Sequence, residues 1–217
     1  MATNLRNQLQ TVAPPRLPAA PVEYSQRYGD DLTNVLRLFF NQLSNGLAAV
    51  LAPEGGKYIN NVYAAIQRTT DVPFTANTAT QITFDQTDYI NGATNDGTDG
   101  IEVDQAGIYN YQFSVQLKNT DSQIHSAWIW LRVNNVDVVG TGSKFDVIAS
   151  HGGTPGFVIA AANFYVELQA GDTVEMWAAS SNTAVTFDAS AAQTSPFPMP
   201  AIPSVVATLT FVSSILT

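Results

Sequence analysis

Residues 107–117 read Gly-Ile-Tyr-Asn-Tyr-Gln-Phe-Ser-Val-Gln-Leu. Large apolar side chains occupy every second position of this stretch, and uncharged polar residues lie between them. Such a period of two is typical of a β-strand with one face in a core. Gly107 supplies the turn that enters the strand. We therefore predict that residues 107–117 form the central strand of an antiparallel β-domain. The apolar positions are Tyr109, Tyr111, Phe113, Val115 and Leu117.

The same alternation recurs along most of the chain after residue 60. Turn-forming segments such as Asn134-Asn135 and Ala170-Gly171-Asp172 interrupt it. The sequence therefore predicts about eight to ten short strands, as in a β-sandwich or barrel. A proline-rich segment, Ser195–Pro200, is expected to be an ordered or partner-bound loop. The strands are expected near residues 61–70, 80–85, 101–103, 107–117, 126–133, 144–150, 157–168, 173–178, 184–188 and 204–212.

The first 60 residues follow a different pattern. Prolines crowd residues 14–21, and because proline lacks a backbone donor this stretch suits an extended conformation. Residues 24–51 place apolar side chains three or four positions apart, which predicts an amphipathic helix. The expected organisation is an extended arm over 1–22, a helix over 23–52, a hinge over 53–60 and a β-domain over 61–217.

The predicted helix has an unusually wide apolar face. Asp30 and Asp31 lie near its start, where the helix dipole favours acids, and Asn45-Gly46 is expected to break it. The apolar face either packs on the β-domain or bundles with copies of itself or with a larger assembly. Its position between an arm and a β-domain favours the second interpretation. The residues expected to anchor or assemble the chain are Leu17, Tyr24, Tyr28, Leu32, Val35, Leu36, Phe39, Phe40 and Leu43.

Composition and charge exclude several classes of function. The chain has 217 residues, a net charge of −9 and no cysteine, so disulfides and cysteine nucleophiles are excluded. Residues 61–217 hold most of the acidic side chains, which argues against nucleic-acid binding. No apolar run is long enough for a membrane span, and the N-terminus lacks the apolar centre of a signal peptide. We expect a protein that is made in a cytoplasm.

Candidate sites for chemistry are few. Trp128 and Trp130 lie on the face of their strand opposite the core residues, so they are expected either to be buried against another surface or to contact a carbohydrate or peptide. Asp96 and Asp99 lie in a glycine-rich loop with some likeness to a calcium loop, although the EF-hand glutamate is missing. The two histidines, His125 and His151, are expected at the surface. No nucleophile elbow, phosphate loop or dinucleotide fingerprint occurs, so we expect a protein that is not an enzyme and has no cofactor.

Five short motifs follow one another from about residue 82 onward. They are Phe84-Asp85, Ala106-Gly107-Ile-Tyr109-Asn-Tyr-Gln-Phe113, Trp130-Leu-Arg-Val-Asn134-Asn135, Leu168-Gln-Ala-Gly171-Asp172-Thr-Val174 and Leu209-Thr-Phe211. Their order resembles the C1q/tumour-necrosis-factor-like (C1q/TNF-like) jelly roll, a two-sheet antiparallel sandwich that forms trimers. The resemblance implies a homotrimer in which Tyr109, Tyr111 and Phe113 contribute to the core or to trimer contacts. The Gly-X-Y stalk of C1q does not occur here.

The front of the chain carries a second resemblance. The residues that carry it are Arg16-Leu-Pro18, Pro21, Tyr24, Tyr28 and Leu32, followed by residues 36–43. This part of the sequence resembles the N-terminal module of tailed-bacteriophage structural proteins. This resemblance implies a virion protein, a head decoration, fibre or spike, that residues 1–52 attach to other capsid or tail proteins. Its outer loops would be free to contact a host glycan or protein. The alternatives are a carbohydrate-binding lectin that uses Trp128, Trp130 or Trp177 and a tail-fibre receptor-binding module.

Overall fold

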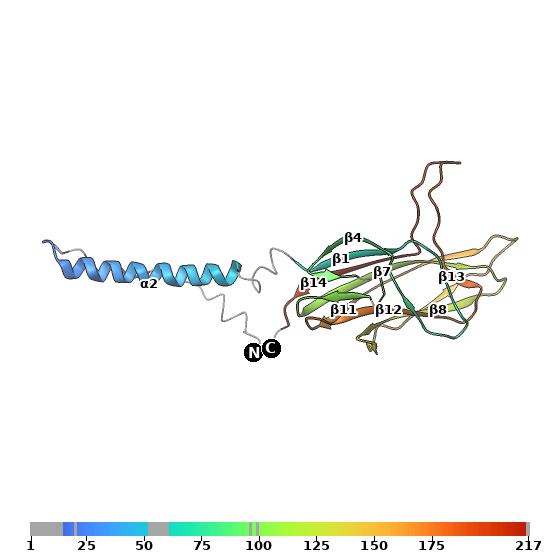
Figure 1. Ribbon diagram of the computed structural model, residues 1–217, viewed down its shortest axis with the longest axis horizontal. Helices are drawn as coiled ribbons and strands as arrows, with labels where there is room; N and C mark the ends of the chain where they lie inside the picture. Colours follow the sequence, from blue (N-terminus) through green and yellow to red (C-terminus); the bar gives the residue numbers. More distant parts are fainter. Residues whose placement is uncertain (1–14, 20, 52–60, 96, 99, 216–217) are drawn as a thin grey trace. The chain divides into compact units, whose positions relative to one another are not determined.

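The computed structural model describes residues 15–19, 21–51, 61–95, 97–98 and 100–215. The chain forms two units, one that contains residues 1–60 and one that spans Asn61–Ile215 and is named the β-unit. Within the described residues, one helix belongs to the first unit and all strands belong to the second (Figure 1). The prediction of a mainly β chain with one helix is therefore confirmed. The predicted hinge at 53–60 lies outside the described residues.

The helix, α2, spans Gln26–Leu51, close to the predicted range. The Ser25 hydroxyl accepts a hydrogen bond from the Tyr28 backbone N–H at 3.4 Å, as an N-cap residue does. The predicted break at Asn45-Gly46 is wrong, because α2 runs through both residues. One internal glycine costs a helix only about 1 kcal/mol, and the turns on either side outweigh that cost. No described helix combines the length and hydropathy that a membrane span requires.

Sheet A contains seven strands and is organised around the predicted central strand. That strand, β7, spans Gly107–Asn119 and pairs along its whole length with β11, Gly156–Leu168. Its other edge pairs first with β14, Val205–Ser213, and then with β13, Val185–Phe187. β1, Tyr63–Arg68, and β4, Gln86–Asn91, follow beyond β14, and β2, Val72–Pro73, pairs with β13. All of these pairs are antiparallel.

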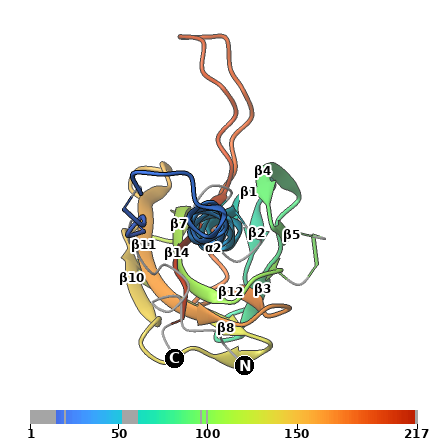
Figure 2. The same cartoon turned by 90° about the vertical axis from the view of Figure 1, so that its left-hand side faces the viewer.

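Sheet B also contains seven strands and stacks on sheet A (Figure 2). Its main order is β10, Ser143–Val147, then β8, His125–Val133, then β12, Thr173–Ser180. The short strands β6, Ile101–Val103, and β3, Thr80–Ile82, both pair with β12. Two more short strands, β5 at Ala93–Thr94 and β9 at Val136–Asp137, pair with β6 and β8.

The core lies between the two sheets and follows the predicted alternation. From Gly107 to Asn119, every second residue of β7 is buried, as the period of two requires. Sheet B contributes the inward side chains of β8 and β12, among them Leu131 and Met176, which are both 0% exposed. The predicted hairpin at Asn134-Asn135 is confirmed, since both residues adopt positive φ angles between β8 and β9.

Candidate functional site

The aromatic row of β7 lies inside the β-unit. Tyr109 and Tyr111 are 0% exposed and Phe113 is 4% exposed. The ring of Tyr109 packs edge-on against Phe211 of β14, and the ring of Phe113 lies 6.3 Å from that of Phe164 on β11. A single chain therefore buries all three rings, and their surfaces are occupied by the core. Of the two roles predicted for these rings, the core or a trimer contact, their burial agrees with the core and leaves no ring surface for a neighbouring copy.

The outer face of sheet A, defined as its side chains that point away from sheet B, is almost free of charge. Along β11, β7, β14 and β1 the outward positions carry only two charged residues, Lys118 and Glu167, at opposite ends. Large apolar side chains are exposed between them, including Ile159 and Tyr165, each 65% exposed. Uncharged and aromatic-rich surfaces are typical of the centres of protein–protein interfaces. The outward positions are Phe157, Ile159, Ala161, Asn163, Tyr165, Glu167, Ile108, Asn110, Gln112, Ser114, Gln116, Lys118, Val206, Thr208, Thr210, Val212, Ser213, Tyr63, Ala65 and Gln67.

β11 adds a long open edge to this face. Within the described residues, β11 forms ladder pairs with β7 alone, so one side of this 13-residue strand has no strand partner. Long edge strands with apolar side chains are liable to associate with other chains unless something covers them. Phe157, which is 52% exposed, lies near the start of this edge.

A two-stranded arm projects from the β-unit on the sheet A side. Residues 189–203 form it, and Figures 1 and 2 both show it as the rust-coloured extension that leaves the unit away from sheet B. Paired backbone hydrogen bonds join Ser190 to Ile202 and Gln193 to Met199, at 2.8–3.0 Å. No residue from 189 to 203 is buried, and none is charged. The sequence predicted only a loop at 195–200, and the signal for the longer arm was this uncharged run.

The base of the arm is firmly tied to the sheets. The Ala189 backbone N–H donates to Asp71 Oδ1 at 2.7 Å. The Ser204 hydroxyl donates to the Thr70 carbonyl at 2.7 Å, and Gln116 of β7 pairs through its backbone with both Asp188 and Ser204 at 2.9 Å. The arm therefore starts from fixed points, while its tip has no support from the described part of its own chain.

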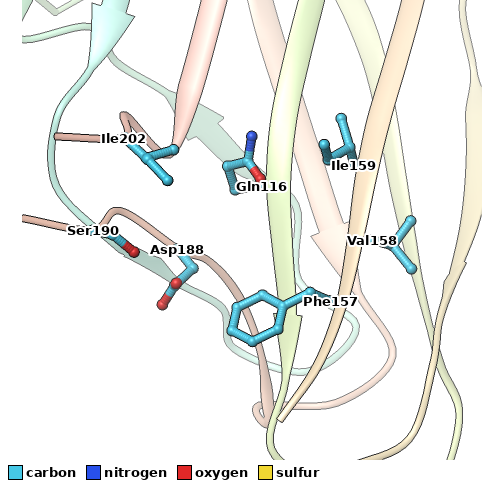
Figure 3. A pocket seen from close by; sticks show the side chains of 7 residues that line it. All are labelled: Gln116, Phe157, Val158, Ile159, Asp188, Ser190 and Ile202. Atoms are coloured by element: carbon cyan, nitrogen blue, oxygen red, sulfur yellow. The ribbon is translucent and has the colours of Figure 1, made fainter. Parts of the chain in front are cut away.

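A hollow of about 360 Å³ lies beside the base of the arm on the outer face of sheet A (Figure 3). The Asp188 carboxylate at its rim accepts a hydrogen bond from Lys118 Nζ at 2.6 Å, so its charge is balanced. This contact raises the pKa of Lys118, and burial partly opposes the rise. Figure 3 shows the Phe157 ring pointing toward Asp188. The hollow is lined by Gln116, Phe157, Val158, Ile159, Asp188, Ser190 and Ile202.

The three tryptophans lie on the outer face of sheet B. Trp130 and Trp177 are cross-strand neighbours, and Trp128, which is 36% exposed, lies opposite Ala179. The Trp130 indole N–H donates to Asp137 at 2.8 Å, and the Arg132 guanidinium carbon lies 4.0 Å from the centroid of the Trp177 ring.

A buried carboxylate completes this cluster. Glu175 is 2% exposed and accepts hydrogen bonds from the Trp177 indole N–H and the Asn135 backbone N–H, each at 2.7 Å. Hydrogen bonds from Arg132 and Trp130 lower the pKa of Asp137. The polar groups of Trp130 and Trp177 are thus used within the sheet, where they fix the β8–β9 hairpin. Trp128 has the most accessible ring of the three.

The predicted anchoring residues lie in the first unit. Tyr28, Leu32, Val35, Leu36, Phe39 and Leu43 share one face of α2 and are half-buried. Phe40 is 58% exposed on the same helix, and Leu17 and Tyr24, which precede it, are 55% and 94% exposed. No side chain from Gln26 to Leu47 is fully buried.

The remaining predicted sites are the calcium-like loop and the two histidines. Asp96 and Asp99 lie outside the described residues. In the part of the chain that is described, no group of three or more His, Asp or Glu side chains could hold a metal ion. His125 is half-buried and pairs with Asp121 at 2.7 Å, whereas His151 is exposed. No family model matches the sequence, and a search of curated proteins found no match.

Proposed function

We propose that this chain is a structural protein of a tailed-bacteriophage particle. In this proposal the β-unit is displayed as a homotrimer, and the segment over residues 1–52 attaches it to other virion proteins as a head decoration, fibre or spike. The observation that carries the proposal is the almost uncharged outer face of sheet A, whose exposed apolar side chains a solitary domain would leave in water. The number of copies comes from the resemblance to the trimeric C1q/TNF-like fold.

The strand order supports a jelly roll. Strands β11-β7-β14-β1 of sheet A face strands β10-β8-β12-β6 of sheet B. The chain changes sheets after β2, β3, β4, β6, β7, β10, β11 and β12, so it crosses repeatedly between the two layers, as chains do in jelly rolls. We therefore propose that the β-unit is a jelly roll of the C1q/TNF-like type.

The two outer faces differ in the way that an assembly requires. The outer face of sheet B carries two ion pairs, Arg132 with Asp137 at 2.6 Å and Lys144 with Asp146 at 3.1 Å. Such charged side chains suit contact with water. The outer face of sheet A lacks such pairs along β11 and β14. In this proposal sheet A turns toward neighbouring copies and sheet B toward solvent. Likewise, the apolar face of α2 is covered by copies of itself or by another virion protein.

The oligomer is tested with two matched variants of the full-length protein. Tyr165→Glu places a charge on the edge strand β11, within the outer face of sheet A, and Val139→Glu places one in the loop after β9, at a residue that is 99% exposed. Native mass spectrometry at micromolar concentration should give a trimer for the wild type and for Val139→Glu, and mainly monomer for Tyr165→Glu. A wild-type monomer would refute the homotrimer.

The anchor is tested on particles. Phage that encode a chain without residues 1–52 should yield purified particles that lack the protein, because the attachment segment is missing. The isolated variant is checked by circular dichroism for an intact β-unit. If mass spectrometry of the particles finds the shortened chain at its normal copy number, the anchoring role is wrong.

A further inference from the structure

We propose that the arm over residues 189–203 is a clasp between copies of this chain, and that its tip, with Phe197, seats in the hollow of the next copy. The inference rests on the proposed homotrimer and names the contact that holds it together. Each copy would give one arm and receive one, a head-to-tail contact that forms a closed ring when the rotation between copies closes.

The position of the arm favours this contact. The arm leaves the β-unit from the same side as the outer face of sheet A (Figures 1 and 2). Seven residues separate Ser190 at its base from Phe197 at its tip, which corresponds to about 23 Å of extended chain. A copy that packs on the outer face of sheet A beside the base of the arm would therefore meet the arm.

The composition of the arm fits a protein contact better than contact with water. The fifteen residues from Ala189 to Pro203 carry no charge in a chain with a net charge of −9. Phe197 is 57% exposed and stands among Pro196, Pro198 and Pro200. An isolated two-stranded hairpin is at best marginally stable in water, so a projecting arm of this kind gains stability from a partner surface.

The hollow has the size and chemistry to receive the tip. A cavity of 150 Å³ can hold a benzene ring, and the hollow measures about 360 Å³, which leaves room for a phenylalanine ring and a flanking proline. Phe157, Ile159 and Ile202 supply apolar walls, and the charge of Asp188 is balanced by Lys118. An uncharged apolar tip thus meets a hollow without an unpaired charge, and both belong to every copy.

The contact is tested with cysteines, which the natural chain lacks. Two full-length chains are co-expressed, a tagged chain with Phe197→Cys and an untagged chain with Ile159→Cys, so a disulfide between them must join two copies. Oxidation should produce a tagged–untagged dimer on a non-reducing gel, because a disulfide forms only when the Cβ atoms lie about 3.5–4.5 Å apart. The matched control replaces Ile159→Cys with Val139→Cys and should give no dimer.

A second variant measures the contribution of the ring. Phe197→Ser removes the side chain from an exposed position and should leave folding unchanged by circular dichroism. Because truncation of a buried aromatic side chain weakens an interface, the variant trimer should dissociate at a protein concentration at least about tenfold higher than the wild-type trimer does.

The outcomes separate the clasp from the homotrimer. A trimeric protein that gives no tagged–untagged dimer, with Phe197→Ser equally stable as a trimer, overturns the clasp and leaves the homotrimer standing. A tagged–tagged dimer would instead place two tips together, and equal dimer yields with Val139→Cys would indicate random collision; either result overturns the clasp. A wild-type monomer overturns both proposals.

Discussion

Two buried tyrosines on one strand offer a sharp test of the core. Tyr109 and Tyr111 are both 0% exposed and point the same way from β7. The Tyr109 hydroxyl donates to the Gln105 carbonyl at 2.6 Å. Among the described residues, no group accepts from or donates to the Tyr111 hydroxyl. The same substitution, tyrosine to phenylalanine, should therefore have opposite effects at the two positions.

The magnitudes follow from the cost of a hydrogen bond. Tyr109→Phe loses one bond and should reduce the free energy of unfolding by about 1 kcal/mol. Tyr111→Phe removes a buried polar group that has no partner, so it should increase that free energy by up to about 1 kcal/mol. The two variants should thus differ by about 2 kcal/mol, or roughly 4–8 °C in Tm for a chain of this size.

Urea unfolding of the full-length protein, followed by tryptophan fluorescence, measures this difference. All variants are compared at one protein concentration, because association adds to apparent stability. Burial raises the pKa of both tyrosines above its ordinary value, so neither hydroxyl ionises at neutral pH. Equal loss of stability in both variants would show that the Tyr111 hydroxyl has a partner, and the account of the core around β7 would be wrong.

Two further predictions concern a turn and an ion pair. Gly156→Ala should lower the free energy of unfolding of the β-unit by about 3 kcal/mol or more, as a severe core change does, because a Cβ there collides with the Ile148 carbonyl. Gly153→Ala, at a φ of 83° with open space around the Cβ, should lower it by only about 1 kcal/mol. Urea unfolding measures both changes. Hydrogen bonds from Arg132 and Trp130 lower the pKa of Asp137. The contribution of Asp137 to the stability of the fold is therefore present above about pH 4 and is lost as the pH falls through the lowered pKa. Asp137→Asn should therefore flatten the decline of the urea midpoint between pH 5 and pH 2, and an unchanged decline would contradict the assignment.

The strands that sequence could predict are those with one buried face. β7, β8 and β12 alternate apolar and polar residues because one side of each meets the core, and their predicted positions agree with the structure to within two residues at each end. β4 was missed because its residues, Gln-Thr-Asp-Tyr-Ile-Asn, lie at a sheet edge, where no side chain is buried and no alternation is required.

Long-range features were beyond sequence reasoning for a different reason. The pairing of β7 with β14 depends on which strands meet in space, and local periodicity carries no such information. The hollow likewise combines β7, β11 and the base of the arm, which lie far apart in the chain. In α2, Asn45-Gly46 matched a helix stop, yet the helical preference of the flanking leucines and alanines prevailed.

The place of β14 in sheet A bears on how the protein folds during synthesis. β14 is the last strand of the β-unit, and it lies between β1, the first strand, and the central strand β7. Among the described strands, β1 and β4 join the rest of sheet A only through β14, as Tyr63 pairs with Thr210. Pairs so distant in sequence form slowly. β14 must therefore emerge from the ribosome before β1 and β4 can join β7 in sheet A. Until then β1 lacks its partner β14.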